Sequence, residues 1–111
     1  MDDLEARVRA HCERFNAAQR GNAWGAFVDT FAEDARMAFT NVPVGPFHGR
    51  AEILAAYEVS PPDDTMEIVG VEAVAERTAR ARFRWSAGAP GTMFLRFDAE
   101  GLVADLQITF G

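Results

Sequence analysis

The 111-residue sequence has little of what disulfide-linked, metal-binding or membrane proteins need. Its single cysteine, Cys12, cannot form an internal disulfide, which fits a reducing cytoplasm. One cysteine and two histidines give no metal-ligand spacing. No apolar run approaches the length of a membrane span, and the charged opening MDDLEARVRA lacks the apolar segment of a signal peptide. We therefore expect a cytoplasmic protein without disulfides or metal.

Basic residues are also in the minority. Eleven Lys and Arg against 17 Asp and Glu give a net charge of -6 and a pI near 4.8. Phosphate binding needs clustered basic residues, and an acidic surface gains nothing at an anionic membrane, so neither nucleic acid nor a membrane is expected as a partner. A hydrophobic fraction of 49%, with nine Phe, is typical of a globular chain. The length predicts one domain over residues 1–111.

Helical periodicity runs through the first half of the chain. Apolar residues on one stripe predict a helix over residues 2–20, which Gly21 ends. A second stripe predicts a helix over 23–33. A short third helix over about 50–58 ends before Ser60-Pro61-Pro62, because a residue that precedes proline is pushed out of the α region.

A strand over 36–41 and a Pro/Gly-rich corner over 43–49 separate the second and third helices. Side chains on a strand alternate, so Met37 and Phe39 share a face with Asn41. An amide that points toward an apolar interior needs a partner or a ligand. Two roles are open for Asn41: a hydrogen-bonding group in a pocket, or a residue that caps the corner through its own backbone.

From Thr65 onward the period changes to that of strands, over residues 65–74, 78–87, 91–98 and 102–110. In the second of these, Phe83 and Trp85 face away from the neighbouring arginines, as in an antiparallel sheet that is covered on one side. Helices followed by a strand meander predict an α+β domain. A curved sheet with helices on its concave side encloses a mostly apolar pocket, suited to a small molecule. The predicted lining is Met37, Phe39, Asn41, Tyr57, Phe83, Trp85, Met93, Leu95 and Leu106.

Three stretches carry a family resemblance: Gly21-Asn22 through FVDTFAEDARM, PVG followed by HGRAEILAAY, and RFDAEGLVADLQITFG. In their order and spacing the chain resembles the SnoaL-like and ketosteroid isomerase-like branch of the nuclear-transport-factor-like superfamily, over nearly its whole length. The resemblance implies a cone-shaped barrel, formed by a curved, mostly antiparallel sheet with three N-terminal helices around a pocket. It also implies a homodimer through the outer face of the sheet. If the protein is an enzyme, we expect its chemistry to need no metal or cofactor.

The resemblance does not extend to the catalytic residues. Steroid isomerases of this family use an Asp base near the PVG corner, with a Tyr and a protonated Asp as oxyanion donors. Asn41 lies nearest the base position, Met93 falls at the donor Asp, and Arg14 or Phe15 falls at the Tyr. Only Tyr57 matches, at a tyrosine that supports the catalytic one in the family. Loss of a general base alone removes roughly 10²–10⁴ in rate.

Two hypotheses about function remain open. In the first, the protein binds or converts an apolar small molecule by isomerase-, cyclase- or hydratase-like chemistry: Asn41 orients the substrate, His11 or an unidentified carboxylate moves protons, and Tyr57 donates a hydrogen bond. In the second, it is a non-catalytic ligand-binding or dimeric accessory domain. A titratable group with an altered pKa in the cavity wall would favour the first. The roles of His48 and Asp29 stay open, and the sheet's outer arginines are either solvated or part of a dimer interface.

Overall fold

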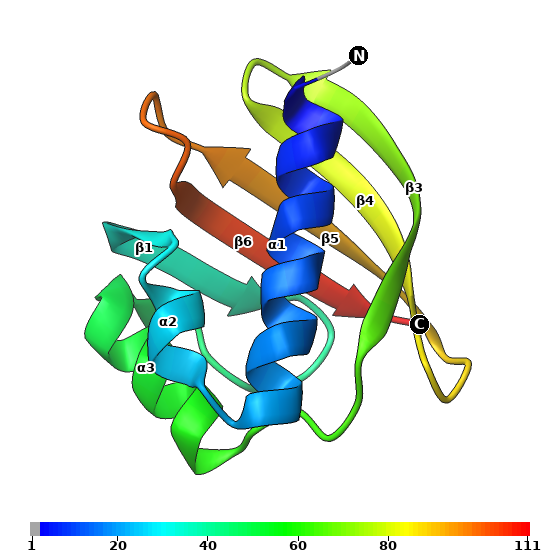
Figure 1. Cartoon of the computed structure of the whole chain (residues 1–111). Coiled ribbons are helices and arrows are strands. Elements are labelled where there is room, and N and C mark those ends of the chain that lie inside the picture. The colour runs from blue at the N-terminus through cyan, green and yellow to red at the C-terminus, as the bar shows by residue number, and fades with distance from the viewer. Residues whose placement is uncertain (1–2) are drawn as a thin grey trace.

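A computed structural model describes residues 3–111 as a six-stranded sheet with helices on one face (Figure 1). The order of strands across the sheet is β2-β1-β6-β5-β4-β3. The elements in chain order are α1 (Asp3–Gly21), α2 (Trp24–Val28), β1 (Phe31–Phe39), β2 (Phe47–His48), α3 (Gly49–Val59), β3 (Met66–Ala75), β4 (Thr78–Trp85), β5 (Pro90–Phe97) and β6 (Val103–Phe110).

The predicted α+β class is confirmed, and the sheet is mixed and open. β1 pairs with β6 in parallel, and all other neighbours are antiparallel. β2 and β3 form the two edges, so the strands do not close into a barrel. Figure 1 shows α1 lying across one face of the sheet, with α2 and α3 beside it.

The first and third helices and the four later strands lie within one or two residues of their predicted ranges. Residue 2 of the first predicted helix lies outside the described residues. The two-residue strand β2 was not expected, since the sequence there reads as part of the Pro/Gly-rich corner.

The predicted helix over 23–33 is wrong in its second half. α2 ends at Val28, and the Thr30 hydroxyl donates to the carbonyl of Phe27 at 2.6 Å. The chain then enters β1 at Phe31, which pairs with Val103 of β6. Pairing with a distant strand overrides the local helical pattern, although Phe31 is fully buried, as its place on the apolar stripe indicated.

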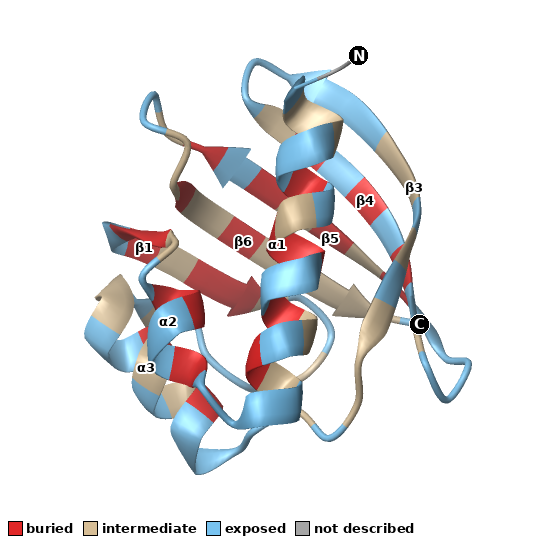
Figure 2. Cartoon of the chain, in the orientation of Figure 1, coloured by how far each residue is buried: buried red, intermediate tan, exposed pale blue. Residues whose placement is uncertain are grey.

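Alternation of buried and exposed residues gives the sheet one apolar and one polar face. In β4, Ala79, Ala81 and Phe83 are buried between exposed arginines, and Figure 2 shows similar banding on β5. β3 departs from this rule because its register with β4 shifts twice, between Ile68 and Gly70 and between Ala73 and Ala75. Val69 and Val74 are therefore exposed.

Two polar side chains attach helices to the sheet. On α1, Asn16 Nδ2 donates to the carbonyl of Met66 at 2.8 Å, and Asn16 Oδ1 accepts from the Met66 N–H at 2.9 Å. On α3, Arg50 Nε donates to the carbonyl of Phe31 at 2.8 Å. Each bond satisfies a backbone group at the start of a strand and so fixes where the helix lies.

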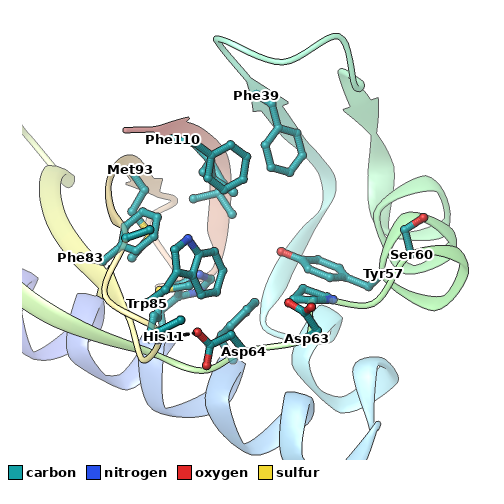
Figure 3. A pocket seen from close by; sticks show the side chains of 17 residues that line it. His11, Phe39, Tyr57, Ser60, Asp63, Asp64, Phe83, Trp85, Met93 and Phe110 are labelled. Carbon is teal, nitrogen blue, oxygen red and sulfur yellow. Dashed lines mark hydrogen bonds between the residues drawn. The ribbon is translucent and has the colours of Figure 1, made fainter.

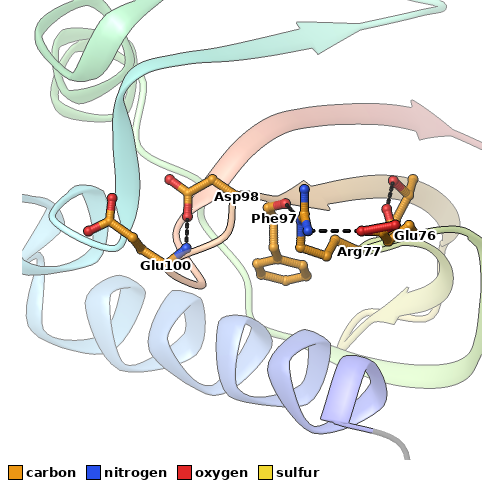
Figure 4. A network of polar contacts seen from close by, with 6 residues as sticks. Glu76, Arg77, Phe97, Asp98 and Glu100 are labelled. Atoms are coloured by element: carbon orange, nitrogen blue, oxygen red, sulfur yellow. Dashed lines mark hydrogen bonds and ion pairs between the residues drawn. The ribbon is translucent and has the colours of Figure 1, made fainter.

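Turn contacts hold the strand ends opposite the β4–β5 hairpin (Figure 4). Arg77 Nε donates to the carbonyl of Phe97 at 3.3 Å, and Asp98 Oδ1 accepts from the N–H of Glu100 at 2.9 Å. These contacts order one end of the sheet. The cavity described below lies at the opposite end. Across residues 3–111, no helix has the length and hydropathy needed to cross a bilayer.

Candidate functional site

A cavity of about 450 Å³ lies between α1, α3 and the ends of β1 and β3–β6 (Figure 3). This volume is within the range of small-molecule sites. Its wall is formed by His11, Phe15, Phe39, Tyr57, Ser60, Pro62, Asp63, Asp64, Met66, Phe83, Trp85, Ala87, Ala89, Met93, Leu106, Ile108 and Phe110.

Strand alternation builds most of the wall. Leu106, Ile108 and Phe110 point to the same side of β6, and Phe83 and Trp85 do so on β4. Phe83 and Trp85 meet edge to face, with ring centroids 5.4 Å apart. The result is a largely apolar and aromatic surface, with its polar groups few and separate.

His11 is the buried titratable group of the wall, with a side chain only 4% exposed. Burial, with a smaller effect of the Arg14 charge, lowers the pKa of His11 to about 4. The imidazole is therefore neutral at neutral pH. Its Nδ1 is buried and has no hydrogen-bond partner within residues 3–111.

Tyr57 contributes the phenol of the wall. Its ring stacks on Trp24 with centroids 4.7 Å apart and planes 8° from parallel, which fixes its orientation. Figure 3 shows the hydroxyl pointing into the cavity. Burial raises the pKa of Tyr57 above its ordinary value, so the hydroxyl stays protonated and can donate.

Two carboxylates border the mouth, and sequence reasoning missed both. Asp64 Oδ1 accepts from the Thr65 N–H at 2.8 Å, and its Oδ2 accepts from the Ala87 N–H at 2.9 Å. These bonds tie the connection after α3 to the β4–β5 hairpin. Asp63 is exposed at the same rim. The sequence feature that could have indicated them is the Pro61-Pro62 pair. It follows the end of α3 and directly precedes the two acidic residues.

The expected place of Asn41 in the pocket wall is wrong. β1 ends at Phe39, and Asn41 is exposed beyond it. Its Nδ2 donates to the carbonyl of Phe110, and its Oδ1 accepts from the Phe110 N–H at 3.1 Å. The amide thus pairs with the backbone of β6 as one more strand residue would, instead of capping its own corner.

Seven of the other sequence-predicted residues do line the cavity: His11, Phe39, Tyr57, Phe83, Trp85, Met93 and Leu106. Met37 does not; it borders a neighbouring hollow of about 480 Å³, which shares Phe39 and Tyr57 with the cavity. Leu95 is fully buried in the core and lies two residues after Met93 on the same face of β5.

The residues whose roles were open lie elsewhere. His48 is exposed, and its backbone N–H donates to Glu52 at 2.9 Å at the start of α3. Asp29 is exposed after α2, and neither residue lines the cavity. Burial raises the pKa of the Cys12 thiol, which donates to the carbonyl of Met66 at 3.4 Å. In the described part of the chain, no three His, Cys, Asp or Glu are grouped to hold a metal ion.

The fold and the cavity place the chain among α+β proteins that have a pocket. Comparisons with known proteins identify its family within that class. A family model for the SnoaL-like domain matches residues 8–106, and the chain belongs to that family. A SnoaL-like protein of unknown function from Burkholderia thailandensis is similar in structure, with a TM-score of 0.75, 15% identity and 96% of each chain covered.

A second solved structure is a putative ketosteroid isomerase from Kribbella flavida, with a TM-score of 0.66 and 22% identity. The similarity covers 96% of this chain and 78% of that one. At these identities, the two likenesses concern the fold alone. No curated protein matches the sequence.

Proposed function

We propose that this protein binds an apolar small molecule in the cavity between α1, α3 and the sheet. One observation carries the proposal: a largely apolar wall, rich in aromatic rings, surrounds about 450 Å³ and holds two buried polar groups, His11 and Tyr57, at separate points. Such a wall buries the body of an apolar ligand, while a few polar groups fix its orientation.

The protonation states of these two groups favour binding over proton transfer. His11 is neutral and has a free Nδ1, and Tyr57 keeps its proton. A neutral imidazole and a phenol are suited to hold a carbonyl or hydroxyl of the ligand by hydrogen bonds. Both groups have altered pKa values, and each is altered in the direction that keeps it uncharged.

A thermal-shift screen against steroids, aromatic polyketide-like compounds and small enones tests the proposal. A ligand at a hundred times its dissociation constant stabilises the folded state by about 2.7 kcal/mol. We expect at least one compound to raise the melting temperature of the parent and to lose most of this effect in Trp85→Ala. Trp85→Phe keeps an aromatic wall, and Val74→Ala changes an exposed residue of β3 away from the cavity, so both should respond as the parent does.

The absence of any response from the parent across a broad apolar library would contradict the proposal. Equal responses from the parent and Trp85→Ala would place binding outside the cavity.

A second candidate function is cofactor-free isomerase or cyclase chemistry. It is favoured by the presence of an imidazole, a phenol and the Asp63 carboxylate around one apolar cavity. It ranks second because a general base works best with a pKa near the working pH, and that of His11 is about 4.

Deuterium uptake from D₂O into a bound ketone, followed by NMR, tests this second function without knowledge of the product. If the protein is a catalyst, the rate of deuterium uptake should fall by roughly 10²–10⁴ when the general base is removed. The variant that shows this loss, Asp63→Asn or His11→Leu, identifies the base. Tight binding with no uptake above the rate in buffer would leave ligand binding as the function.

We propose further that two copies pair through the outer face of the sheet. This face carries Arg80, Arg82, Arg84 and Arg96, and the half-buried Phe94 lies among them. In the described residues, Arg80 pairs with Glu72 and Arg84 with Glu67, whereas Arg82 and Arg96 form no ion pair. A two-fold contact could supply those two arginines with partners.

A further inference from the structure

The charged residues in the cavity wall are all acidic. Asp63 and Asp64 line the cavity, no arginine among residues 3–111 does so, and the sequence has no lysine. The neighbouring hollow adds Glu52 and, again, no arginine. His11 is neutral, so it does not offset these charges. A ligand that carries a carboxylate or phosphate would meet only like charge at this mouth.

Asp63 is the carboxylate that is free to meet a ligand. Asp64 is occupied by the N–H groups of Thr65 and Ala87, which hold its charge in place at the rim. Asp63 is exposed and has no hydrogen bond or ion pair with any residue in 3–111. Figure 3 shows its carboxylate near the mouth, on the side of Tyr57.

Three aromatic rings lie in the partly exposed part of the wall, which also includes the exposed Ser60, Ala87 and Ala89. Phe39, Phe110 and Trp85 are half-buried and form a stacked row, with centroids 5.7 Å apart for the first pair and 6.4 Å for the second. The faces of aromatic rings attract cations, most strongly those of Trp. The rim therefore combines a free carboxylate with three rings, a combination that favours a positive charge.

At the inner end of the cavity, the buried polar group is neutral. His11 is 4% exposed, and its Nδ1 has no partner among residues 3–111. An unsatisfied buried nitrogen costs free energy unless a ligand supplies the hydrogen bond. The cavity is thus asymmetric, with a neutral polar contact inside and negative charge at the mouth.

We propose that the ligand is an apolar amine, whose hydrocarbon body fills the cavity and whose ammonium group lies at the rim between Asp63 and the row Phe39, Phe110 and Trp85. The proposal rests on the proposed function and narrows it to one substrate class. Acidic amphiphiles of the same shape are disfavoured by the charge of the rim.

Three probes that share one ring system test the proposal by isothermal titration calorimetry at pH 7.5: 2-(1-naphthyl)ethylamine, 2-(1-naphthyl)ethanol and 1-naphthylacetate. An ammonium near one exposed carboxylate and aromatic faces gains about fivefold in affinity. We expect the amine to bind about fivefold more tightly than the alcohol, and the acetate to bind more weakly than the alcohol. High salt should reduce the difference, since the charges are near solvent.

Asp63→Asn should remove most of the preference for the amine and leave the affinity for the alcohol unchanged. Glu58→Gln is the matched control, because it removes the same charge from an exposed residue of α3 that does not line the cavity. It should alter neither affinity by more than about twofold.

An alcohol that binds as tightly as the amine, or a preference for the amine that survives in Asp63→Asn, would overturn the proposal and leave the apolar pocket intact. Failure of both the amine and the alcohol to bind, together with a silent thermal-shift screen, would contradict the proposed function itself.

Discussion

His11 shows how burial sets the chemistry of a single residue. Its ring packs against Phe27 and Phe31, at centroid distances of 5.1 and 5.9 Å, and its Nδ1 forms no hydrogen bond with any residue in 3–111. A charged imidazole in this place would lose its hydration without gaining a counter-ion. The residue therefore serves a neutral ligand group better than it serves as an acid or base.

The pKa of His11 predicts a pH dependence of stability. The unfolded chain binds a proton at this residue below a pH of about 6.5, whereas the folded state does so only below about 4. Lowering the pH from 6.5 to 4 thus favours unfolding, by up to about 3 kcal/mol at roughly 1.4 kcal/mol per pH unit. Urea unfolding of the parent and His11→Leu across this window measures the effect. The variant should show a clearly flatter dependence, and equal slopes would contradict the assignment.

Asn41 is predicted to matter for stability and not for ligand affinity. Asn41→Ala removes both contacts with the Phe110 backbone at an exposed site, and should lower the free energy of unfolding by about 1 kcal/mol. Asn41→Asp keeps the acceptor for the Phe110 N–H and should lose less. Chemical denaturation, with a titration of the naphthyl alcohol, checks both points. A tenfold loss of affinity in a folded Asn41→Ala would restore this residue to the site.

The sequence correctly predicted the residues whose side-chain direction follows from strand alternation. Phe83, Trp85 and Leu106 line the cavity because strand alternation fixes the side to which they point. It failed for Asn41, because the end of β1 is set by its pairing with β6, which no local pattern records. It failed for Asp63 because the path of the α3–β3 connection depends on tertiary contacts such as that between Asp64 and Ala87.

At the scale of elements, the cavity exists because α1 and α3 are held at fixed places over the sheet. Asn16 fixes α1 to β3, and Arg50 fixes α3 to β1. The helix stripes predicted that both helices pack on something apolar, but a stripe does not state which strand it meets. Asn16 and Arg50, which do determine this, lie off the stripes and gave no signal of their own.

The contact of Asn16 gives an element-scale prediction. Asn16→Leu leaves the N–H of Met66 without its partner and leaves the carbonyl of Met66 with only the weaker bond from the Cys12 thiol, and should cost about 1–3 kcal/mol of stability. Amide hydrogen exchange at Met66 should accelerate in this variant. Glu13→Gln, at an exposed position of the same helix, serves as the control. Unchanged exchange at Met66 would show that α1 is held by other contacts.

At the scale of the whole molecule, charge is distributed unequally. The net charge is -6, yet the outer face of the sheet carries Arg80, Arg82, Arg84 and Arg96, while the cavity mouth carries Asp63 and Asp64. The overall charge therefore hides a basic face and an acidic opening. The first is the face proposed for dimerisation, and the second is the opening proposed to favour a positively charged ligand.

Light scattering after size exclusion tests the pairing of two copies. We expect a mass near twice the 12.2 kDa of the chain, and a return to the monomer mass in Arg82→Glu. Arg20→Glu makes the same charge change at an exposed position near the end of α1 and should stay dimeric. A parent that remains monomeric at high concentration would contradict this proposal without affecting the cavity.

The central claim is that the cavity between α1, α3 and the sheet is a ligand site, and methyl NMR during a titration with the naphthyl alcohol tests it most directly. The account predicts saturable shifts at the lining methyls of Met66, Met93, Leu106 and Ile108, with those of the exposed Val69 and Val74 unmoved. Shifts confined to the valines, or no saturable shift at the lining methyls with any compound that stabilises the protein, would contradict it.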